Sequence, residues 1–146
     1  MQFDTFMLIV LAGALAAYVH LVCALWAPAI KLPSLDFSAA LTRATFEDSF
    51  GGDPPWLLGF VCVHLNGAVL ALLYATAIAP LLPGPPLLRG ILWGMILWLA
   101  AMLLFVPMVL RDGIFASKRH PRAWITAALV HGLYGMVVGW LCPILE

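Results

Sequence analysis

The stretch LVHGLYGMVVGW, residues 129–140, is apolar enough to cross a lipid bilayer, and it combines one histidine with three glycines. Residues spaced four apart share one face of a helix, so His131, Gly135 and Gly139 lie along one stripe. Glycines let a neighbouring backbone approach closely, as in the small-xxx-small packing of membrane helices. The stretch therefore predicts a membrane-spanning helix whose histidine faces another helix rather than lipid.

The composition of the whole chain agrees with a lipid environment. Of its 146 residues, 64% are hydrophobic and only 10% are charged, whereas a soluble domain is about half apolar and about a quarter charged. The formal net charge is zero, and the few basic residues form no stripe that would follow a phosphate backbone. We therefore expect the lipid bilayer as the surroundings of the chain and no nucleic acid as a partner.

Four apolar runs are long enough to cross a bilayer as helices, which takes about 20 residues. Spanning strands would be about half as long and would alternate polar with apolar residues, which these runs do not. We expect an all-α integral membrane protein with a single domain, residues 1–146, built as an antiparallel bundle of four transmembrane helices. The approximate spans are residues 4–27, 56–80, 87–110 and 122–144.

The longest connection joins the first two spans. Within it, residues 34–46 have a capping residue at Ser34 or Asp36 and apolar residues at helical spacing, which predicts a short helix at the membrane interface. Six of the seven Lys and Arg residues lie in the loops 28–55 and 111–122. The positive-inside rule therefore puts both loops in the cytoplasm and both termini outside.

Three histidines are expected at one depth inside the bundle. His20, His64 and His131 each have small residues on their own side of the helix. Each lies about seven to nine residues from the cytoplasmic end of its span, which is roughly 10–14 Å at 1.5 Å per residue. Cys23 is one turn away from His20. The pattern predicts an inward-facing layer of imidazoles, with a thiol close to it.

This layer is open to two interpretations. Imidazole is a ligand for zinc, copper and haem iron, so His20, His64 and His131 are candidate binding residues for haem or a pigment. The same three residues with Cys23 are candidate ligands of a transition metal. Alternatively, the side chains only hydrogen-bond between helices, which contributes about 0.6 kcal/mol each on average. The sequence does not decide whether a cofactor binds.

Glycines at helical spacing mark the expected helix contacts. Gly90 and Gly94 form one G-x-x-x-G motif, Gly135 and Gly139 form another, and Gly67 lies on the side of its helix that carries His64. Such motifs serve packing within a bundle, self-association, or contact with another membrane subunit.

The functional expectation follows from what the spans hold. No Ser-His-Asp set, phosphate-binding loop or paired carboxylate site is visible, so an enzyme is not expected. The leading hypothesis is an accessory or structural subunit of a larger membrane complex. The alternatives are a haem-, pigment- or metal-binding protein that uses the histidine layer, and a small transporter or channel. The last is disfavoured because no acidic residue lies deep inside a span.

A pattern of histidines and glycines extends from about residue 56 to residue 142. It contains H-x-x-G at His64, LLRGILWG in the third span and H-x-x-Y-G at His131. This pattern resembles small four-helix bacterial inner-membrane proteins of uncharacterised function. The resemblance implies a four-helix fold and a location in the bacterial inner membrane, and it implies no activity.

Overall fold

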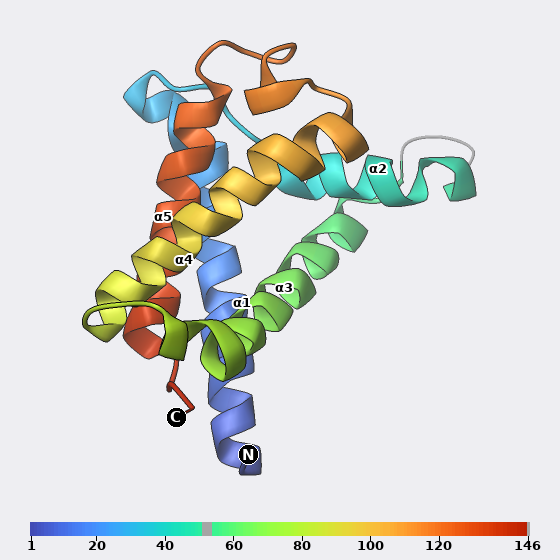
Figure 1. Cartoon of the computed structure of the whole chain (residues 1–146). Helices are drawn as coiled ribbons and strands as arrows, with labels where there is room; N and C mark the ends of the chain where they lie inside the picture. The colour runs from blue at the N-terminus through green and yellow to red at the C-terminus, as the bar shows by residue number, and fades with distance from the viewer. Residues whose placement is uncertain (51–53, 146) are drawn as a thin grey trace.

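The computed structural model describes residues 1–50 and 54–145, and all regular structure within these ranges is helical (Figure 1). Four helices are long and apolar enough to cross a membrane. This confirms the all-α class and the four apolar spans expected from the sequence. The spans are Phe3–Ile30, Trp56–Leu81, Pro86–Leu110 and Ala123–Leu141.

Each span is built from one α-helix, and three of them continue in a different helical geometry. The first consists of α1 (Phe3–Trp26) and the 3₁₀ turn η1 (Ala27–Ile30), and the fourth is α5 (Ala123–Leu141) alone. The second consists of α3 (Trp56–Leu73), η2 (Tyr74–Ile78) and η3 (Ala79–Leu81), and the third of α4 (Pro86–Ala100) and η4 (Ala101–Leu110).

Two prolines explain where α5 ends and why η4 departs from α-helical geometry. The fourth helix ends at Leu141 rather than near residue 144, because Pro143 drives the residue before it, Cys142, into the extended region. Within η4, Pro107 has no N–H to donate, and its ring clashes with the carbonyl one turn earlier. There the helix has the wider π geometry, in which each hydrogen bond spans five residues.

The interfacial helix predicted from residues 34–46 is α2 (Phe37–Phe50). Its capping residue is Asp36, because the Ala39 N–H donates to Asp36 Oδ1 at 2.9 Å. The indole N–H of Trp56 donates to the same carboxylate, at 3.1 and 3.0 Å from its two oxygens. One side chain therefore both starts α2 and ties it to the first residue of α3.

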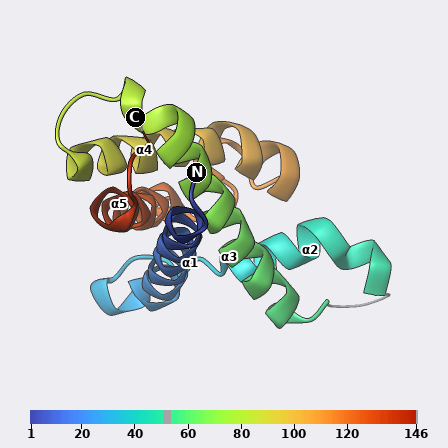
Figure 2. The same ribbon diagram turned by 90° about the horizontal axis from the view of Figure 1, so that it is seen from below.

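The helices follow one another in an antiparallel order, but they do not close into a ring. Helix α1 lies between α3 and α5, and α4 packs on the outer side of α5 (Figure 2). The contacts of α4 with the second span are made mainly through η2 and η3. Toward the other end, α3 and η4 separate, and α2 lies across that end (Figure 1). Both termini lie at the end opposite to α2.

Glycines determine where the helices touch. Gly90 and Gly94 of α4 lie directly against the backbone of Gly135 and Gly139 of α5, at the end of the molecule that holds the termini. A side chain at Gly135 would collide with the Gly90 carbonyl oxygen. Because these helices cross at their glycines, α4 leads away from α5 toward the α2 end. A similar contact joins α1 and α3, where Gly67 lies against Gly13 and Ala17.

The glycine contact predicts a difference between two identical substitutions in α5. Gly135→Ala forces the backbones of α4 and α5 apart, and overpacking of this kind costs about 1–3 kcal/mol. Gly132→Ala is the matched control, since a methyl group there meets nothing within 4 Å and alanine is the better helix former. Thermal unfolding in mild detergent should show a lower midpoint for Gly135→Ala only. Equal midpoints would contradict the packing described here.

Candidate functional site

A cavity of about 600 Å³ lies in the opening between α3 and η4. Its walls come from α1, α2, α3, α4, η4 and α5, so every long helix contributes to it. Most of the lining is aliphatic or aromatic, with Leu70 and Phe105 as examples. The polar side chains of the lining are His20, Asn66, His131 and Tyr134.

Two of the three predicted histidines meet in the wall of this cavity. His20 of α1 and His131 of α5 have ring centroids 4.8 Å apart and ring planes at 88°, an edge-to-face contact. Phe37, at the start of α2, packs on His20 with a centroid distance of 4.6 Å. The direct packing of α1 on α5 brings the two imidazoles together, and Phe37 of α2 covers His20.

The hydrogen bonds of the pair are made within one helix. The Nδ1 atom of His131 lies 2.8 Å from the carbonyl oxygen of Ala127, four residues earlier in α5. Because a carbonyl only accepts, Nδ1 carries the proton and Nε2 is the acceptor of the neutral ring. Neither ring nitrogen of His20 has a hydrogen-bond partner in the described part of the chain. The pair therefore retains hydrogen-bonding or metal-binding capacity.

The third histidine lies elsewhere. His64 stacks on Phe60 of the same helix, at a centroid distance of 4.1 Å, and lies 6.3 Å from the Tyr18 ring. Its Nδ1–H donates to the Phe60 carbonyl oxygen at 2.7 Å. His64 does not line the cavity, whereas Asn66 does. Two residues correspond to about 200° around a helix, so the two side chains leave α3 on nearly opposite sides.

The structure does not assemble the predicted set of metal ligands. Among the side chains that the structure describes, no group of three His, Cys, Asp or Glu residues would hold a metal ion. Of the four candidates, His20 and His131 are adjacent, His64 is apart, and Cys23 packs against the apolar cluster around Met102 and Val106. The adjacent pair supplies two ligands, whereas zinc sites in proteins use three or four.

The distance between the His20 and His131 rings also decides whether the pair can bind haem as its two axial ligands. Two axial imidazoles lie on opposite faces of the porphyrin, with the iron between them. With metal–nitrogen bonds of about 2 Å on each side, the ring centres are further apart than the 4.8 Å between His20 and His131. In this arrangement the two histidines do not enclose a haem.

Tyr134 is a residue of the site that sequence reasoning missed. Its hydroxyl donates to the Gly67 carbonyl oxygen at 2.7 Å, in a buried contact that joins α5 to α3. The acceptor is a backbone atom, and backbone acceptors leave no mark in a sequence. The one available signal was Gly67 itself, since a residue without a side chain leaves its carbonyl open to a neighbouring helix.

Removal of this hydroxyl should destabilise the fold. Tyr134→Phe removes the hydroxyl donor of this buried hydrogen bond, at a cost of about 1 kcal/mol. Tyr18→Phe is the matched control, because Tyr18 is 49% exposed and its hydroxyl makes no hydrogen bond to any described residue. Chemical or thermal unfolding in detergent measures both variants. A Tyr134→Phe protein as stable as Tyr18→Phe would show that the hydrogen bond contributes nothing.

Comparison with known proteins identifies a family. No curated protein sequence and no solved structure is detectably similar to this chain. The model of DUF6789, a family of unknown function, matches residues 5–146. The match agrees with the resemblance to uncharacterised proteins, and it also includes the first span with His20. The chain belongs to the DUF6789 family.

Proposed function

We propose that this protein is a non-catalytic membrane protein that binds a lipophilic molecule in the cavity beside His20 and His131. The observation that carries the proposal is the pair of facing imidazoles in an otherwise apolar cavity of about 600 Å³. Ligand sites are typically concave, about 300–1,000 Å³ in volume and mostly apolar, with a few placed polar groups. The cavity has these properties.

The hydrogen bonding of the histidines favours a ligand over mere helix packing. A histidine that only holds helices together bonds to a side chain or carbonyl of another helix. His131 bonds instead to Ala127 of its own helix, and His20 makes no hydrogen bond to any described residue. Ionisable side chains in spanning helices are costly, and by default they mark functional sites. A bound molecule would supply the missing partner.

The surroundings of the cavity favour a lipophilic ligand over an ion. The described part of its lining includes no Asp, Glu, Lys or Arg, so these residues offer no charge to stabilise or couple an ion. The walls belong to helices of a length and hydropathy that suit a bilayer, and a molecule dissolved in the lipid reaches such a site without crossing water. These features favour binding over ion-coupled transport.

An accessory subunit of a larger membrane complex is the second candidate. The third span supports it, because only 22% of its most apolar window is buried. Leu103, Leu104 and Met108 of η4 are exposed beside the opening to α3. In this alternative, a helix of another membrane protein packs against η4 and fills the opening.

Substitution of the histidine pair tests the first candidate. Protein purified in mild detergent should carry a lipophilic compound near one equivalent, measured by solvent extraction and mass spectrometry. His131→Phe and His20→Phe keep a ring in the cavity wall but remove its nitrogens, so retention should fall at least tenfold. His64→Phe is the matched control and should retain the compound.

Other outcomes of the same purification decide against the proposal. An absorption band of haem, or a stoichiometric metal lost in His131→Phe, would replace the lipophilic ligand with that cofactor. A protein free of small molecules that co-purifies with a fixed membrane partner, in all three histidine variants, would establish the accessory role instead.

We also propose that the chain is a multi-pass protein of the bacterial inner membrane with its α2 end in the cytoplasm. The excess of Lys and Arg residues at that end supports this orientation. In a cysteine-free background, Ser34→Cys places a thiol at the α2 end and Pro83→Cys places one at the opposite end; both residues are exposed. An impermeant maleimide added to spheroplasts should label only Pro83→Cys. Labelling of Ser34→Cys alone would mean the opposite orientation.

A further inference from the structure

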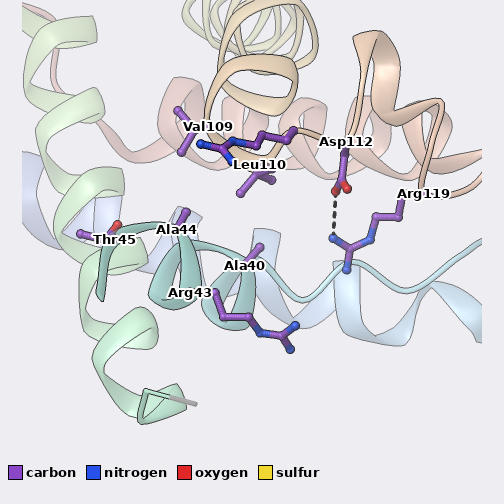
Figure 3. Close-up of a pocket in the computed structure, with 9 residues that line it drawn as sticks. Ala40, Arg43, Ala44, Thr45, Val109, Leu110, Asp112 and Arg119 are labelled. Atoms are coloured by element: carbon purple, nitrogen blue, oxygen red, sulfur yellow. Dashed lines mark hydrogen bonds and ion pairs between the residues drawn. The ribbon is translucent and has the colours of Figure 1, made fainter. Parts of the chain in front are cut away.

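A second cavity, of about 590 Å³, adjoins the apolar cavity at the α2 end. It lies between α2 and the connection that follows η4, and the charged residues in the described part of its lining are Arg43, Arg111, Asp112 and Arg119 (Figure 3). Ala40 of α2 and Val109 and Leu110 of η4 line both cavities. The two cavities are therefore adjacent, with these three small or aliphatic side chains between them.

The described lining of the second cavity carries a net positive charge. Three arginines face one carboxylate, and that carboxylate, Asp112, already pairs with Arg119 at 3.4 Å. Figure 3 shows this pair beside α2, with the Arg43 side chain leaving α2 on the side away from Val109 and Leu110. Arg43 and Arg111 are exposed, so both guanidinium groups are free to turn toward a bound anion. Guanidinium groups bind phosphate and carboxylate oxygens with paired hydrogen bonds.

The connection that carries two of these arginines is held in place by its backbone. Arg111 ends η4 in the left-handed region, at φ 58°, and its N–H donates to the Val106 carbonyl oxygen. The Asp112 N–H reaches the same oxygen at 3.3 Å, and the Lys118 N–H donates to the Asp112 carbonyl oxygen at 2.9 Å. The connection that carries Arg111 and Arg119 is therefore a turn whose position is fixed by backbone hydrogen bonds to the end of the span.

The position of the two cavities matches the layers of a bilayer. The arginine cavity lies at the level where the four spans begin or end, and exposed Trp26, Trp56 and Trp124 lie at the same end of the molecule. Tryptophans of spanning helices gather at the headgroup level. The apolar cavity extends from there toward the middle of the spans, as far as Leu70 and Leu97.

We propose that the two adjacent cavities together bind one anionic membrane lipid. Its negatively charged headgroup lies at Arg43, Arg111 and Arg119, and a hydrocarbon chain enters the apolar cavity and passes His20 and His131. The change from a lining without charge to one with three arginines matches an amphiphile and neither a free ion nor a wholly apolar molecule. This inference rests on the proposed function, in which the apolar cavity binds a lipophilic molecule. It adds that the molecule carries a negatively charged headgroup.

Native mass spectrometry of the full chain in detergent, with two lipids that share dioleoyl chains, tests the inference. Phosphatidylglycerol should bind at least tenfold more tightly than phosphatidylcholine. The triple variant Arg43→Gln, Arg111→Gln, Arg119→Gln should lose this preference. The matched control is Lys31→Gln, Lys118→Gln, Arg122→Gln, which removes the same charge from the same end of the molecule and leaves the cavity lining intact. It should keep the preference.

The source of the anion is tested by competition. Inorganic phosphate and glycerol 3-phosphate, each at 100-fold excess over phosphatidylglycerol, should displace less than a tenth of the lipid, because neither carries a chain for the apolar cavity. Full displacement by either ion would show a site for free anions and would overturn the assignment to a lipid. Equal affinity for the two lipids, or loss of preference in the control variant, would overturn it as well.

The two proposals fail in distinguishable ways. If His131→Phe reduces lipid binding but the wild-type protein does not discriminate between headgroups, the lipophilic site stands and the headgroup site is wrong. If the arginine variant loses the headgroup preference while His131→Phe retains every bound compound, the headgroup site stands and the proposed role of the histidines is wrong. Where the triple variant does not fold, Arg43→Gln on the exposed face of α2 should show at least a threefold loss of preference, and an unchanged preference would contradict the proposal.

Discussion

The contact between the glycine faces of α4 and α5 is the constraint on which the rest of the structure depends. At Gly90, Gly94, Gly135 and Gly139 the two backbones touch, at the end of the molecule that holds the termini. Helices this close at one end, and crossing there, separate toward the other. The position of these glycines therefore determines where the opening between α3 and η4 forms. The cavity lies within this opening and gives access to His20 and His131.

The linings of the two cavities differ in polarity along the length of the helices. Near the middle of the spans the walls are aliphatic and aromatic, and their polar groups are uncharged or imidazole. At the α2 end the lining changes within one turn of η4 to arginine and aspartate. The same short segment, Val109 and Leu110, faces both spaces. An amphiphile with its charge at one end is complementary to this order.

Local features of the fold were predictable from the sequence, because local chemistry determines them. Apolar runs of sufficient length indicated the four spans, and a capping residue at Ser34 or Asp36 before an apolar periodicity indicated the start of α2, which the structure places after Asp36. The relative rotation of the helices was not predictable in the same way. His64 and Asn66 lie two residues apart, and the packing of α3 on α1, with Gly67 against Ala17, determines which of them faces the cavity. The Tyr134 hydroxyl likewise bonds to a backbone oxygen that no pattern of residue types reveals.

Helix α2 is attached to one side of the opening far more than to the other. Asp36 bonds to Trp56, and Ser38 and Thr42 lie against Gly59, so the helix is fastened to the start of α3, while its contact with η4 is slight. Helices α2 and α3 therefore lie together on one side of the opening, and η4 lies on the other. Any swing of α3 carries α2 with it, so the gap through which a chain enters and the distance between Arg43 and Arg111 change together.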